Sequence, residues 1–100
     1  MSRMDFNDFS ASLADKDEPP SGLGPPLEAL WHDAKGDWNK AHELVQDDES
    51  MDAAWVHAYL HRKQGDLSNA LYWYRRANKE VTDMTPEREW TELVSLLLSQ

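Results

Sequence analysis

The sequence predicts an all-α fold, because apolar residues recur at helical spacing and two Gly-Asp pairs divide the chain into similar units. The pairs at residues 36–37 and 65–66 lie 29 residues apart. A repeat of about this length is typical of stacked helical hairpins. We therefore expect two tandem antiparallel hairpins, over roughly 27–48 and 53–80, with a C-terminal capping helix. One hundred residues allow one small domain, which we place at 26–99.

Residues 1–25 are predicted to form a disordered acidic tail. Prolines and glycines cluster near its end, and acids outnumber bases in it. One apolar island stands apart, because Phe6, Phe9 and Leu13 follow at i, i+3 and i+7. That spacing suits an amphipathic helix that docks on a partner or on its own domain. Isolated helices this short are marginal in water, so disorder is the expectation.

The first hairpin begins at Pro26, a favourable first-turn residue. Gly36 ends the first helix and Asp37 caps the second. The apolar stripes of the two helices are Leu27, Leu30, Trp31 and Ala34, then Trp38, Ala41, Leu44 and Val45. The second helix fades in the acidic stretch 47–50.

The second hairpin repeats this plan. Its first helix is expected from about Asp52 to Gln64, and Gly65-Asp66 supplies the next stop and cap. Its second helix carries Leu67, Ala70, Leu71, Tyr74 and Ala77 on one face. A fifth helix starts at Thr85-Pro86-Glu87, with Trp90, Leu93, Val94 and Leu97 as its stripe.

A shift of 29 residues superimposes more than the turns: His32 falls on His61, Trp38 on Leu67, and Ala41 on Ala70. The segment 65–77, GDLSNALYWYRRA, resembles the turn and second helix of a tetratricopeptide repeat. The resemblance is weaker over 27–48, and the family spacing is about 34 residues. It implies right-handed solenoid stacking, a last helix that covers the exposed end, and a groove that binds peptides.

Composition excludes several function classes. The net charge of −9 disfavours nucleic acid and anionic membranes as partners. The absence of cysteine excludes disulfides and thiolate chemistry. No secretory leader or membrane-spanning apolar run is evident, so we expect a cytoplasmic protein. No enzyme signature is present, and no cofactor is expected.

The leading functional hypothesis is a non-enzymatic module that binds a protein or peptide. In the tetratricopeptide arrangement the groove would be lined by Trp55, Tyr59, Arg62 and Lys63, with Asp33 extending its wall. Aromatic and cationic side chains suit a peptide that carries a carboxylate and an apolar residue. The alternative is that the fifth helix fills this groove and that Trp55 belongs to the core. Homo-oligomerisation through the same surface is a further expectation.

The second hypothesis is a metal- or small-ligand-binding site made by His32, His57 and His61. His57 and His61 stand at i, i+4 on one helix face, the spacing of a two-ligand metal clamp. His32 is the repeat equivalent of His61. Structural packing of these histidines is the competing interpretation, and His42 is read as a lone residue that is half-buried or at the surface.

Overall fold

The computed structural model describes residues 4–100, and within that range every regular element is an α-helix. The helices are α1 (Phe6–Asp15), α2 (Pro25–Ala34), α3 (Trp38–Gln46), α4 (Met51–Gln64), α5 (Leu67–Arg76) and α6 (Pro86–Leu98). The all-α prediction is thus confirmed for the described residues. None of these helices is both long and apolar enough to cross a membrane.

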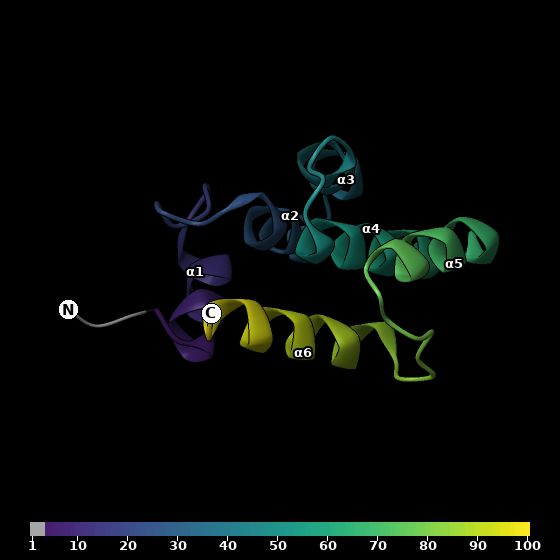
Figure 1. Cartoon of the computed structure of the whole chain (residues 1–100). Coiled ribbons are helices and arrows are strands. Elements are labelled where there is room, and N and C mark those ends of the chain that lie inside the picture. Colours follow the sequence, from purple (N-terminus) through teal and green to yellow (C-terminus); the bar gives the residue numbers. More distant parts are fainter. Residues whose placement is uncertain (1–3) are drawn as a thin grey trace.

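Consecutive helices pack in pairs, α2 against α3 and α4 against α5, and α3 also packs on α4 (Figure 1). The chain turns at Gly36 and Gly65, where φ is +88° and +91°. Glycine adopts this left-handed conformation without steric cost. The following Asp37 and Asp66 cap α3 and α5 by accepting backbone N–H bonds. The two Gly-Asp pairs therefore act as the predicted stop and cap.

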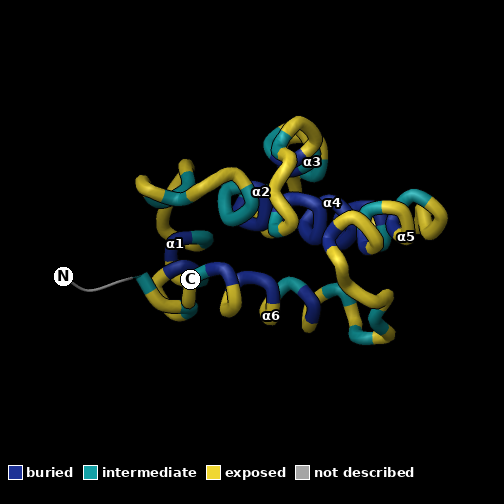
Figure 2. The backbone as a smooth tube through the Cα atoms, in the orientation of Figure 1, coloured by how far each residue is buried: buried dark blue, intermediate teal, exposed yellow. Residues whose placement is uncertain are grey.

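Helix α4 is the central element, since every residue from Ala53 to His61 is buried. Helix α6 runs along α4 and α2 on the side away from α3, and their buried faces meet between them (Figure 2). Thr85 caps α6 and Pro86 starts it, as the sequence predicted. The core of the protein thus lies on both sides of α4.

The N-terminal segment differs from the expected disordered tail. Residues 6–15 form α1, and Asp5 and Asp8 make a capping box at its start. Phe9 is fully buried and lies 6.0 Å from the ring of Trp90 on α6. The Trp31 indole N–H donates to the Ser12 hydroxyl at 3.0 Å. Tertiary contacts thus stabilise a helix that is too short to persist alone, and the domain begins well before residue 26.

Candidate functional site

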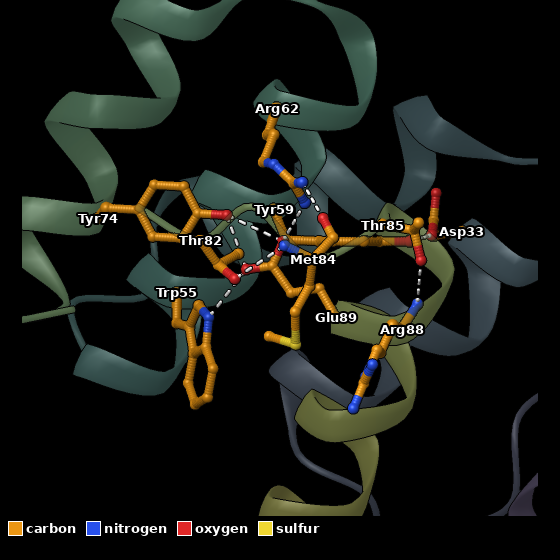
Figure 3. A network of polar contacts seen from close by, with 10 residues as sticks. All are labelled: Asp33, Trp55, Tyr59, Arg62, Tyr74, Thr82, Met84, Thr85, Arg88 and Glu89. Carbon is orange, nitrogen blue, oxygen red and sulfur yellow. Dashed lines mark hydrogen bonds and ion pairs between the residues drawn. The ribbon is translucent and has the colours of Figure 1, made fainter. Parts of the chain in front are cut away.

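The predicted peptide groove on α4 is occupied by α6. Glu89 of α6 is 1% exposed, and its carboxylate accepts hydrogen bonds from the Tyr74 hydroxyl at 2.7 and 2.9 Å. It also accepts from the Trp55 indole at 3.2 Å and from the Arg62 guanidinium at 2.9 Å. Arg62 donates in addition to the carbonyl of Met84 (Figure 3). Trp55 and Arg62 therefore hold α6 in place.

Asp33, Tyr59 and Lys63 form a second polar group on this side of α4. Asp33 is 4% exposed and accepts from the Tyr59 hydroxyl at 2.6 Å and from Lys63 Nζ at 3.0 Å. Burial and the Asp33 carboxylate raise the pKa of Tyr59 far above its usual value. The prediction of an open peptide groove on α4 is therefore wrong. Trp55 and Arg62 bond to Glu89 of α6, and Asp33 bonds to Tyr59 and Lys63.

On another face of α4, three histidines meet. His57 and His61 lie one turn apart and are 3% and 7% exposed. His42 reaches them from α3, where the small, fully buried Ala41 allows close approach of the two helices. The nitrogen atoms that the three rings offer lie within 4.8 Å of one another. We call these three residues the histidine cluster.

Hydrogen bonding within the histidine cluster is incomplete. Nε2 of His57 lies 3.0 Å from Nε2 of His42, so one ring donates and the other accepts. Nδ1 of His57 and Nδ1 of His61 are buried and have no hydrogen-bond partner in the described part of the chain. A buried polar atom without a partner costs about 1–3 kcal/mol. The cluster thus keeps polar atoms that packing alone does not require.

Two tryptophans cover the histidine cluster. Trp73 of α5 stacks on His57 at 3.9 Å with 15° between the planes, and Trp38 stacks on His42 at 4.9 Å and 10°. The Trp38 indole N–H is anchored on the carbonyl of Leu60 at 2.9 Å. These contacts fix two of the imidazole planes and exclude water from much of their surface.

Burial favours the uncharged forms of His57 and His42. Burial, followed by the neighbouring His42 and His61, lowers the pKa of His57 to about 4. Burial and His61 also lower the pKa of His42, against a smaller opposing effect of Glu43. The lone pairs of neutral imidazoles are the form that binds metal ions. The arrangement therefore suits a cation better than an anion.

The histidine prediction was right for His57 and His61 as neighbours but wrong for two others. His32 lies outside the cluster, with its ring against Trp31 at 5.2 Å. The 29-residue alignment paired it with His61, but equivalent positions in two similar sequence units need not touch. His42 is half-buried, one of the two surroundings predicted for it, but it does not stand alone, because it completes the cluster. The spacing Trp38-x-x-Ala41-His42 was the available signal, because it puts a small residue beside the histidine on a helix that contacts α4.

No family model, curated protein or solved structure matches this chain. Functional inference therefore depends on the geometry of the molecule itself.

Proposed function

We propose that the protein binds a divalent transition-metal ion through His42, His57 and His61. The observation that carries this proposal is the set of three buried or half-buried imidazoles, two of them with an unpaired Nδ1. Three imidazole nitrogens without a thiolate favour Zn²⁺, Cu²⁺, Ni²⁺ or Co²⁺ over Mg²⁺ or Ca²⁺.

The nitrogens of the cluster need only small shifts to coordinate such an ion. Nitrogens that share a tetrahedral Zn²⁺ at about 2.0–2.1 Å lie roughly 3.3–3.4 Å apart. Nε2 of His42 and Nε2 of His57 are 3.0 Å apart, so this pair must widen slightly, and the three ligating nitrogens all lie within 4.8 Å of one another. Rotation of the imidazole rings supplies changes of this size. A fourth position would remain for water or another ligand.

The test is titration of the tag-free protein with Co²⁺ and Zn²⁺, followed by calorimetry and by the visible spectrum of Co²⁺. We expect one ion per chain and a Co²⁺ spectrum of low coordination number. His57→Phe should weaken binding by at least about a hundredfold, because loss of a supporting residue alone costs about 10–100-fold.

His32→Ala is the matched control, since this histidine lies outside the cluster. It should bind the ion as the parent does. Equal loss in both variants, or no binding at micromolar metal, would contradict the proposal. Far-ultraviolet circular dichroism of each variant separates loss of the site from loss of the fold.

A second candidate function is binding of a protein partner. The surface that we propose for it lies on α5, whereas the sequence had placed it on α4. Leu67, Leu71 and Tyr72 are 66%, 38% and 51% exposed, and Arg75 and Arg76 flank them. An apolar patch beside cations suits an acidic partner segment. Leu71→Asp should abolish capture of a partner from the source cell, whereas the nearby exposed Ser68→Asp should not. The pairing of consecutive helices supports the tetratricopeptide-like stacking that we propose for this module.

A further inference from the structure

A cavity of about 320 Å³ lies where α1, α2, α4 and α6 meet. This volume is at the lower end of the range for small-molecule sites. Its lining includes Leu13, Asp33, Tyr59, Lys63, Glu87 and Trp90. Tyr59 and Lys63 are two residues away from His57 and His61, which places them on a different face of α4. The cavity is therefore separate from the histidine cluster.

One group in the cavity lining is a buried carboxylate with a half-exposed counter-ion. Asp33 is almost fully buried, yet the cation that neutralises it is Lys63, whose side chain is 42% exposed. A buried charge needs a partner, whereas a half-exposed lysine can turn into water at little cost. The contacts of Asp33 show what this carboxylate accepts, namely an ammonium at 3.0 Å and a phenol hydroxyl at 2.6 Å.

The rest of the lining favours a cation with an apolar body. Leu13, Pro86 and Trp90 supply apolar and aromatic surface, and the Trp90 indole N–H is already bonded to the carbonyl of Leu30. Aromatic faces attract ammonium groups. Glu87 adds a second carboxylate to the lining, and the net charge of −9 raises the local concentration of cations.

We propose that this cavity binds a small primary ammonium compound with an apolar or aromatic body. The ligand ammonium takes the place of Lys63 Nζ at the Asp33 carboxylate, and Lys63 turns outward. The body lies against Trp90 and Leu13. The site needs no metal and is independent of the histidine cluster.

The experiment is calorimetric and NMR titration of the protein, in the presence of chelator, with phenethylammonium. The comparison compound is 3-phenylpropionate, which has a similar body and the opposite charge. We expect saturable binding of the cation, with shifts at Trp90, and much weaker binding of the anion. Absence of saturable cation binding, or equal binding of both compounds, would overturn the proposal.

Three variants locate the binding. Ala34→Phe and Thr91→Trp place bulk in the cavity at exposed positions, so each should weaken binding by about tenfold or more while the fold persists. Lys63→Met removes the competing ammonium and should tighten binding several-fold. Lys40→Met, an exposed lysine that does not line the cavity, is the matched control and should leave binding unchanged. Undiminished binding in both cavity-filling variants would place the ligand elsewhere and refute the site.

Discussion

Two faces of α4 bury polar side chains, and they do so in opposite ways. Under α6, the Glu89 carboxylate accepts hydrogen bonds from three side chains, one of them a guanidinium. In the histidine cluster, two Nδ1 atoms have no partner in the described part of the chain. A fully bonded network orders a core, whereas unpaired buried atoms persist at a cost in stability. The comparison indicates a structural role for the Glu89 network, and it is the reason why we propose a binding role for the histidine cluster.

The largest expected effect comes from removing the centre of the bonded face. Glu89→Ala leaves Arg62, Tyr74 and Trp55 without their shared acceptor. Breaking a buried ion pair on one side costs about 3–5 kcal/mol of unfolding free energy. Urea denaturation measures this loss, and Glu92→Ala, an exposed acid on the same helix, is the control. A loss below about 1 kcal/mol would mean that the Glu89 network stabilises the fold no more than the histidine cluster does.

Lowering the pH should reduce the unfolding free energy of the metal-free protein, because His57 of the histidine cluster is neutral in the folded state. The folded state holds His57 neutral down to about pH 4, whereas its ordinary pKa is 6.5. Between these values the unfolded chain binds more protons, so stability falls as the pH is lowered through this window. The expected loss is about 2–3 kcal/mol, measured by urea denaturation at several pH values with chelator present. In His57→Phe this part of the pH dependence should vanish, and an unchanged profile would argue against a neutral, buried His57.

Substitution of a single donor tests how far the Glu89 network depends on that donor. Tyr74→Phe removes one hydroxyl, but Glu89 keeps its bonds from Trp55 and Arg62. The variant should lose about 1–2 kcal/mol of unfolding free energy, because a hydrogen bond to a charged acceptor contributes more than one between neutral groups. Thermal unfolding of Tyr74→Phe and of Glu89→Ala compares the stability losses of the two variants. A cost equal to that of Glu89→Ala would mean that Tyr74 alone holds the network.

The smallest change in stability is expected for a substitution in the histidine cluster. His57→Phe replaces an imidazole that has an unpaired Nδ1 with a ring that still stacks on Trp73. At pH 7 without metal, the unfolding free energy should change by less than about 1 kcal/mol, since the lost His42 contact is offset by removal of the unpaired atom. Denaturation by urea gives the value. A loss of several kcal/mol would make the histidine cluster a structural core like the face under α6.

Much of the fold was predictable, because glycine stops, aspartate caps and apolar spacing act locally. The docking of α1 was not predictable, since it depends on contacts with residues far along the chain, such as that of Phe9 with Trp90 and that of Ser12 with Trp31. The site was half predictable. The i, i+4 spacing of His57 and His61 is local, but the partnership with His42 depends on how α3 lies on α4. Filling of the groove by α6 was foreseen as the alternative, yet the match between Glu89 and its three donors is a tertiary property.

The contact between Phe9 and Trp90 has a consequence for the order of folding. It joins residues 81 positions apart in the sequence, whereas the hairpin contacts are made between neighbouring helices. Local pairs close quickly, and closure of a long loop carries a larger entropic cost. We therefore expect the two hairpins to assemble first and the terminal helices to dock last. The ends of the chain would then also be the first parts to open.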